Sequence, residues 1–70
     1  MDTRISGTTR LLGIIGSPVN RVGSPVMYNF CFDHYKLDYV YMAFDCREDQ
    51  VKETLDAVRR LNMRGVSVTM

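Results

Sequence analysis

The sequence predicts an α/β fold in which parallel strands alternate with helices. Three segments rich in apolar and β-branched residues have the length of strands, and two segments between them show helical spacing of apolar residues. Helical connections of this length join parallel strands. The predicted order is therefore β-α-β-α-β, with mainly parallel strands. A sheet this small covers its faces poorly, so we expect an incomplete portion of a larger, three-layer domain.

The polar start of the chain predicts a tail outside this domain. Residues 1–10, MDTRISGTTR, show no periodicity and no apolar core of a secretory signal, so we expect a flexible tail followed by a domain at 11–70. No apolar stretch approaches the ~20 residues that span a bilayer. The net charge of +1 is nearly balanced and does not point to nucleic acid or an acidic membrane as a partner. We therefore expect a cytoplasmic protein without nucleic-acid or membrane partners.

The first repeat of strand and helix contains the most informative segment. Residues 11–15, LLGII, form a continuous apolar run typical of a strand buried on both faces. A loop rich in turn residues follows at 16–23. Ser24 and Pro25 then fit the N-cap and first position of a helix that extends to about Lys36. That helix is apolar over a wide surface, which predicts contacts on two sides.

The second half of the chain repeats the pattern. Residues 39–45, YVYMAFD, predict a strand, and 66–70 predict the start of a third. Between them, Asp45 and Glu48 have capping-box spacing before an amphipathic helix at about 47–62. The predicted buried stripe of this helix consists of Val51, Leu55, Val58 and Leu61.

Neither a nucleotide motif nor a metal motif is present. Gly13 and Gly16 do not complete the G-x-G-x-x-G pattern of dinucleotide-binding loops. Cys31 and Cys46 lack metal-ligand spacing, which favours two free thiols in a reducing compartment. His34 has no visible catalytic partner, so we expect it to pack or lie at the surface.

Two interpretations of Ser24 remain open on chemistry alone. Its hydroxyl either caps the helix or, together with the first free N–H groups, binds an anionic ligand. Thr69 lies at the carboxyl end of the third strand, where ligands of open α/β sheets bind. Tyr41, in the second strand, has a ring suited to the core and a hydroxyl that could reach the same crevice. Ser24, Thr69 and Tyr41 are therefore the candidate site residues.

Three blocks of the chain, taken together, resemble the shikimate dehydrogenase family, including its quinate/shikimate dehydrogenase branch. These are LGIIGSPVNRVGSPVMYN at 12–29, YVYMAF at 39–44 and NMRGVSVTM at 62–70. They occur in the family's order and spacing. The resemblance implies an NAD(P)-dependent oxidoreductase of aromatic amino acid biosynthesis, which interconverts shikimate and 3-dehydroshikimate and, in one branch, quinate and 3-dehydroquinate.

The resemblance also implies roles for single residues. The family's Ser-x-Ser-Pro loop binds the substrate carboxylate; its second serine corresponds to Ser24, but its first corresponds to Val22, which has no hydroxyl. Thr69 corresponds to the residue that contacts the ring hydroxyls. Tyr41 matches a tyrosine near the substrate in the quinate-using branch. The family's catalytic lysine lies beyond Met70, so this chain provides no catalytic residue.

The implied function is therefore that of an N-terminal substrate-binding fragment. The NADP or NAD site belongs to a domain outside these 70 residues, and the chain alone is expected to be inactive. Its partners are a small acid, shikimate or quinate, and either the missing remainder of the protein or a second copy. The alternative is a non-catalytic ligand-binding or association module derived from the same family.

Overall fold

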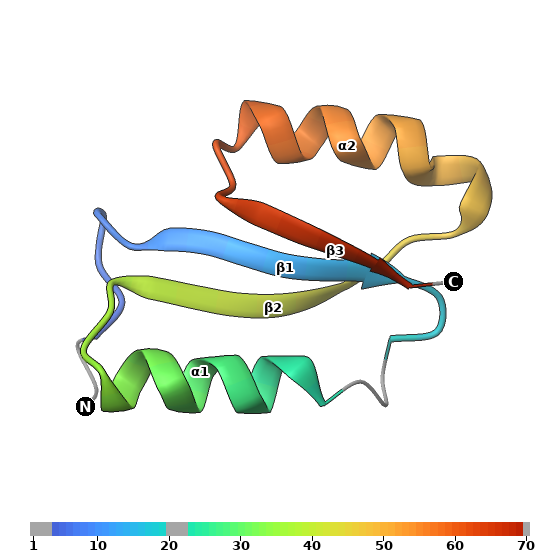
Figure 1. Cartoon of the computed structure of the whole chain (residues 1–70). Coiled ribbons are helices and arrows are strands. Elements are labelled where there is room, and N and C mark those ends of the chain that lie inside the picture. Colours follow the sequence, from blue (N-terminus) through green and yellow to red (C-terminus); the bar gives the residue numbers. More distant parts are fainter. Residues whose placement is uncertain (1–3, 20–22, 70) are drawn as a thin grey trace.

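The computed structural model describes residues 4–19 and 23–69, and within them the fold is a small α/β unit (Figure 1). The predicted order of strands and helices is confirmed. The elements are β1 (Arg10–Gly16), α1 (Ser24–His34), β2 (Tyr39–Asp45), the 3-10 turn η1 (Glu48–Gln50), α2 (Val51–Arg60) and β3 (Gly65–Thr69). None of the helices in the described ranges is long and apolar enough to cross a membrane.

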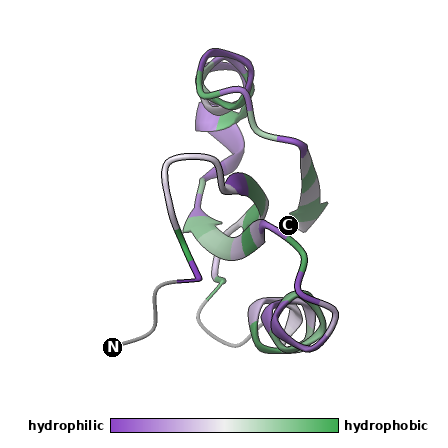
Figure 2. Ribbon diagram, turned by 90° about the vertical axis from the view of Figure 1, so that its left-hand side faces the viewer, coloured by the Kyte–Doolittle hydropathy of each residue, from purple (hydrophilic) through white to green (hydrophobic). Residues whose placement is uncertain are grey.

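The three strands form one parallel sheet in the order β2-β1-β3. Ile14, in the central strand, lies opposite Ala43 on one side and Ser67 on the other. The two helices cover opposite faces of this sheet, which gives three layers (Figures 1 and 2). Neighbouring β1 residues reflect this arrangement, because Ile14 packs with α1 whereas Ile15 faces α2.

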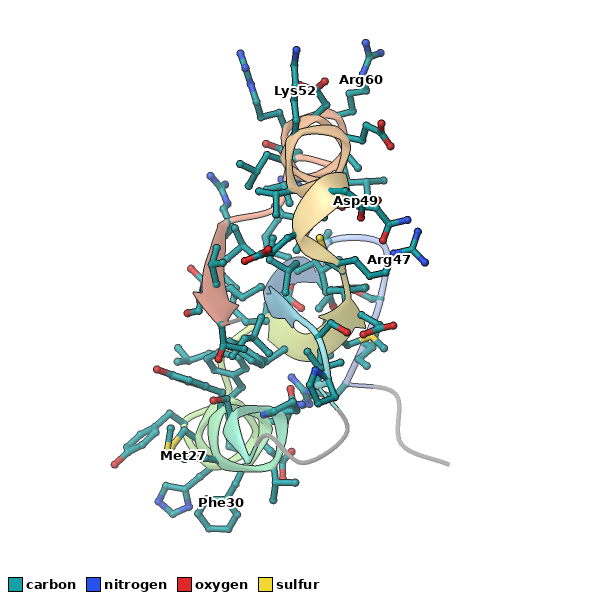
Figure 3. The ribbon with its side chains drawn as sticks, turned by 90° about the vertical axis from the view of Figure 1, so that its right-hand side faces the viewer. Met27, Phe30, Arg47, Asp49, Lys52 and Arg60 are labelled. Carbon is teal, nitrogen blue, oxygen red and sulfur yellow. The ribbon has the colours of Figure 1, made fainter. Side chains whose placement is uncertain are left out.

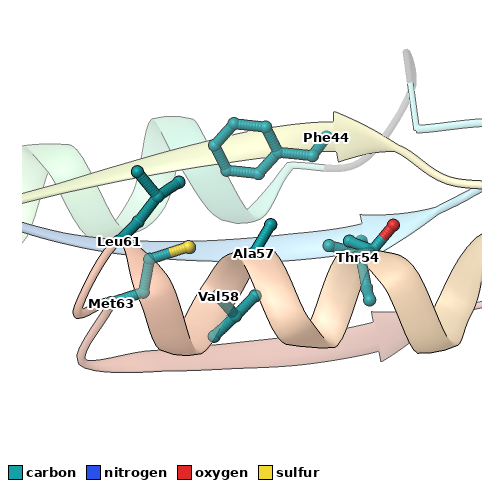
Figure 4. Close-up of a pocket in the computed structure, with 7 residues that line it drawn as sticks. Phe44, Thr54, Ala57, Val58, Leu61 and Met63 are labelled. Carbon is teal, nitrogen blue, oxygen red and sulfur yellow. The ribbon is translucent and has the colours of Figure 1, made fainter.

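The core is concentrated beneath α1. Ile14, Phe32 and Tyr41 are buried together there, and the partly buried residues packed against them are Leu12, Tyr39 and Ala43. Beneath α2, Ile15 is fully buried, and Figure 4 shows an apolar pocket between this helix and the sheet. That pocket is lined by Ile15, Phe44, Thr54, Ala57, Val58, Leu61 and Met63.

The predicted buried stripe of the second helix is only half correct. Val51 and Val58 are partly buried, but Leu55 and Leu61 are 39% and 66% exposed. The reason is that a three-stranded sheet is too narrow to cover the whole apolar face of α2.

The outer face of α1 is apolar and exposed. Val26, Met27 and Phe30 are 78%, 55% and 70% exposed, and Figure 3 shows Met27 and Phe30 directed away from the sheet. The sequence predicted contacts on two sides of this helix. The structure provides one of them, through the side that packs on β2.

Both helices end earlier than predicted, and the chain leaves each of them through a residue in the left-handed conformation. At the end of α1, Lys36 adopts a left-handed φ of 58°, and the N–H of Leu37 donates to the carbonyl of Phe32 at 2.8 Å. At the end of α2, Asn62 has a φ of 55°, and the N–H of Met63 bonds back into the last turn in the same way. These are Schellman motifs, which satisfy carbonyls that the helix leaves free.

The capping box predicted from Asp45 and Glu48 is wrong. β2 continues through Asp45, and the N-cap of η1 is Arg47, whose backbone N–H donates to the side chain of Gln50 at 3.2 Å. The α-helix itself starts only at Val51. Asp45 belongs to β2 and not to a helix cap, because the backbone of Asp45 pairs with Gly16 of β1.

Part of the segment predicted as a tail is bound to the sheet. Thr8 and Thr9 each donate a hydroxyl hydrogen bond of 2.6 Å to the Asp38 carboxylate, and the backbone of Arg10 bonds to the carbonyl of Asp38 at 3.0 Å. The two hydroxyls, aided by nearby arginines, hold the pKa of Asp38 below its ordinary value. Regular structure therefore begins at Arg10, one residue before the predicted domain boundary.

Candidate functional site

The carboxyl edge of the sheet is where the candidate residues meet. Because all strands are parallel, they end on the same side, and both helical segments start there (Figure 1). Gly16 at the end of β1 lies between Asp45 of β2 and Thr69 of β3. Ser24 starts α1 at this same edge. The fold thus brings Ser24 and Thr69 to one edge from positions 45 apart in the sequence.

Thr69 is held against Gly16 at very close range. A Cβ atom on Gly16 would lie 1.8 Å from the carbonyl oxygen of Thr69 and 2.7 Å from its Cγ2. Thr69 shares its face with Ser67 two residues earlier, and Ser67 lies opposite Ile14, which packs against α1. Thr69 therefore belongs to the α1 face of the sheet, which is the side on which Ser24 lies.

Ser24 is the first residue of the helix rather than its N-cap, so the prediction of a serine cap is wrong. Gly23 occupies the cap position, its carbonyl accepts from the N–H of Met27 at 3.2 Å, and no side chain caps this helix. Glycine and serine are both favoured at N-caps, and here the glycine takes the role. Among the described residues, none forms a hydrogen bond with the Ser24 hydroxyl.

The N-terminus of α1 also has the better electrostatics for an anion. Its first turn carries no acidic residue, whereas the turn that leads into α2 starts with Glu48 and Asp49. The free N–H groups of a helix start attract negative charge, and nearby carboxylates cancel this effect. Of the two helix starts at this edge, the one that contains Ser24 is therefore suited to a carboxylate.

Tyr41 lies in the core, as expected for its ring. Its side chain is 5% exposed and stacks on Tyr28 with ring centroids 4.6 Å apart. The contact of its hydroxyl with a ligand stays a prediction. Tyr41 and Tyr28 line a groove on the α1 face together with Gly65 and Ser67.

Tyr28 and Ser67 line the groove but were not among the candidate site residues predicted from the sequence. Periodicity could have identified both of them. Tyr28 lies one helical turn after Ser24, and Ser67 lies one strand repeat before Thr69. They extend the candidate surface from the strand ends into the middle of the sheet.

Val22 and Met70 lie outside the described residues. The assignment of Val22 to the first serine position of the family loop is therefore a prediction from the sequence.

The glycines of β1 serve packing rather than nucleotide binding. A Cβ on Gly13 would lie 2.9 Å from the carbonyl oxygen of Met42 and 2.9 Å from the ring of Phe44. Together with the contact at Gly16, this explains both glycines by the neighbouring strands.

The cysteines and the histidine are not among the residues that line the groove. Cys31 and Cys46 are free thiols, and Cys46, which is fully buried, donates to the Thr54 hydroxyl at 3.3 Å. His34 is exposed and stacks on Phe30. In the ranges that the structure describes, no group of three or more His, Cys, Asp or Glu side chains could hold a metal ion.

These features define a small three-layer α/β unit with the candidate residues Ser24 and Thr69 at the carboxyl ends of its parallel strands. Residues 14–70 match the family model "Shikimate dehydrogenase substrate binding domain". The chain belongs to this family, and the resemblance identified from the sequence is confirmed.

Curated relatives agree along the whole chain. Over all 70 residues, the chain is 49% identical to the NADP(+) shikimate dehydrogenase of Alkaliphilus metalliredigens and 39% identical to that of Methanococcus maripaludis, and it covers 24% of each. It thus spans about a quarter of the length of the relatives that it matches.

Solved structures show the same fold. Shikimate 5-dehydrogenase of Listeria monocytogenes, determined in complex with shikimate and NAD, superposes with a TM-score of 0.94 at 38% identity over 100% of this chain and 24% of that one. Shikimate dehydrogenase of Aquifex aeolicus gives 0.89 at 33% identity over 94% of this chain and 25% of that one.

Proposed function

We propose that this chain is the N-terminal part of the substrate-binding domain of an NAD(P)-dependent oxidoreductase that interconverts shikimate and 3-dehydroshikimate. The observation that carries the proposal is that the family match includes both Ser24 and Thr69, and that these residues lie at the same edge of the sheet. We place the protein in the cytoplasm, where aromatic amino acids are made. Quinate is a second candidate substrate.

In this proposal the two residues bind opposite parts of one small acid. Ser24 and the free N–H groups at the start of α1 bind the carboxylate, since that helix start carries no acidic residue. Thr69 binds a ring hydroxyl from the end of β3, where Gly16 fixes its position. Tyr41 supports the wall between them through its stacked ring and contributes its hydroxyl to the ligand.

The chemical step requires groups outside this chain. A nicotinamide cofactor, NADP+ or NAD, held by another domain would supply the hydride acceptor. The proton of the substrate hydroxyl needs a positioned base, and we assign it to the family lysine beyond Met70. The described residues bind and orient the acid.

The test is turnover by the full-length protein that contains this chain. We expect reduction of NADP+ or NAD in the presence of shikimate, and a raised KM without loss of folding for Ser24→Ala. Tyr35→Ala, on a side chain that is 68% exposed at the far end of α1, is the control and should keep the wild-type KM. Absence of turnover with both shikimate and quinate would contradict the proposal.

The alternative is a non-catalytic association module of the same family. The exposed outer face of α1, with Val26, Met27 and Phe30, favours this alternative. Light scattering after size-exclusion chromatography of the 70-residue chain tests it. Stable self-association of a chain whose full-length form lacks dehydrogenase activity would support this alternative, and a compact monomer would contradict it.

A further inference from the structure

The outer edge of β2 exposes backbone groups at every second residue. β2 is an edge strand, because the order of the sheet is β2-β1-β3. In a strand, the backbone N–H and C=O groups of alternate residues point to opposite sides. The carbonyl of Asp38 and the N–H of Cys46 bond toward β1. The odd-numbered residues between them, Tyr41 included, therefore direct their backbone groups to the free edge.

Asn29 satisfies both backbone groups of Tyr41 at this edge. Its Nδ2 donates to the Tyr41 carbonyl at 2.8 Å, and its Oδ1 accepts from the Tyr41 N–H at 2.9 Å. The side-chain amide thus replaces the peptide group that a fourth strand would offer. Asparagine is suited to this because it carries one donor group and one acceptor at fixed geometry.

These are the hydrogen bonds that join α1 to the sheet within the described residues. The other contacts of the helix with the sheet are apolar or aromatic, through Phe32 and Tyr28. Apolar burial is non-directional, so it resists separation of the layers better than sliding or rotation. Two hydrogen bonds of fixed direction to one residue determine where α1 lies along β2.

Asn29 lies close to the carboxyl edge of the sheet, where Ser24 and Thr69 are found. Asn29 is five residues after Ser24, which is about 7.5 Å along the axis of a helix. β2 is paired directly with β1, whose Gly16 contacts Thr69. A shift of α1 along β2 would therefore change the separation between Ser24 and Thr69.

We propose that Asn29 is a positioning residue for substrate binding, which acts through Ser24 by locking α1 to the backbone of Tyr41. The inference rests on the proposed function, because it concerns the shikimate site of that enzyme. Asn29 need not touch the acid. Its amide sets the distance between the carboxylate-binding end of α1 and the hydroxyl-binding end of β3.

A double-mutant cycle on the full-length protein tests this role. We expect Asn29→Ala to raise the KM for shikimate about tenfold, since displacements of about 1 Å in binding groups have effects of this order or larger. In the Ser24→Ala background, the same change should raise KM less than about twofold, because the group that Asn29 positions is already absent. A residue that only stabilises the fold would give the same fold-change in both backgrounds.

Two further variants make the cycle decisive. Asn29→Ser, which is neutral and too short to bridge both backbone groups of Tyr41, replaces Asn29→Ala if that variant does not fold. Arg4→Met is the matched control, because Arg4 donates to the carbonyl of Tyr39 at the same strand edge but at the opposite end of the sheet. It should leave KM within about twofold of wild type.

The outcomes separate this inference from the proposed function. An inactive wild type would contradict the proposed function. An active wild type in which Asn29→Ala leaves KM unchanged, or raises it equally with and without the Ser24 hydroxyl, would overturn the role of Asn29 alone.

Discussion

Replacing Gly16 by alanine should damage both stability and substrate binding through one contact. The added Cβ would lie 1.8 Å from the carbonyl oxygen of Thr69, whereas real Cβ contacts essentially never fall below 3.0 Å. Thr69 would therefore have to retreat by more than about 1 Å. The contacting atom belongs to the backbone of a paired strand, so a rotamer change cannot relieve the clash.

The size of the effect follows from this geometry. Forcing an extra methyl group into a packed site costs about 1–3 kcal/mol. The lower entropy of alanine in the unfolded chain offsets about 0.4–1 kcal/mol of this cost. A net loss of about 1–2 kcal/mol lowers the Tm by about 2–8 °C at 150–250 residues, and by less in a longer protein such as the relatives, of which this chain is 24%. Displacement of Thr69 by this distance should lower kcat/KM by about 100-fold.

Thermal unfolding and steady-state kinetics of the full-length protein measure both effects. Gly7→Ala is the control, because no atom lies within 4 Å of its added Cβ and Gly7 is far from the carboxyl edge of the sheet. It should retain the wild-type Tm and kcat/KM. The reasoning is refuted if Gly16→Ala behaves like Gly7→Ala.

Three other predictions concern hydroxyl groups and one carboxylate. Ser24→Ala should raise KM about tenfold, as expected for a lost hydrogen bond to a charged ligand. It should change the unfolding free energy by less than about 0.5 kcal/mol, because the serine does not cap the helix. A large fall in stability would contradict this prediction. Val22→Ser, which restores the hydroxyl of the family loop, should lower the KM for shikimate about tenfold, and an unchanged KM would remove Val22 from the site. Thr8→Val combined with Thr9→Val should raise the pKa of Asp38 toward its ordinary value, measured by NMR titration of the carboxyl group. Because folding lowers the pKa of Asp38, its hydrogen bonds stabilise the folded state above the pKa of the unfolded chain, and this stabilisation is lost as pH falls through the pKa of the folded state. An unchanged titration in the double variant would show that the two hydroxyls are not the cause.

The order of elements was predictable because it depends on local periodicity. Buried strands and helices of distinct period alternate along the chain, and such alternation permits few topologies. The ends were less predictable. Asparagine, the residue type of Asn62, often adopts the left-handed conformation at a helix end, whereas lysine, the residue type of Lys36, rarely does. The end of α1 was therefore not predictable from its local sequence.

The candidate site was predictable only where strand ends and family motifs coincide. Ser24 and Thr69 could be selected because both flank the carboxyl edge of the sheet. The choice between Gly23 and Ser24 as N-cap could not be made, since adjacent residues both favour that position. The bonds of Asn29 to Tyr41 join residues 12 positions apart across two layers, and no periodicity in the sequence encodes such a pair.

The central position of β1 has a consequence for synthesis on the ribosome. The strand made first is the one that both others pair with, so each later strand adds to a neighbour that already exists. β1, α1 and β2 can associate once residue 45 has emerged, and β3 then joins the opposite side of β1 after one further helix. Both pairings of β1 therefore join segments that are separated by no more than one further strand and its helices, and such low sequence separation favours fast folding.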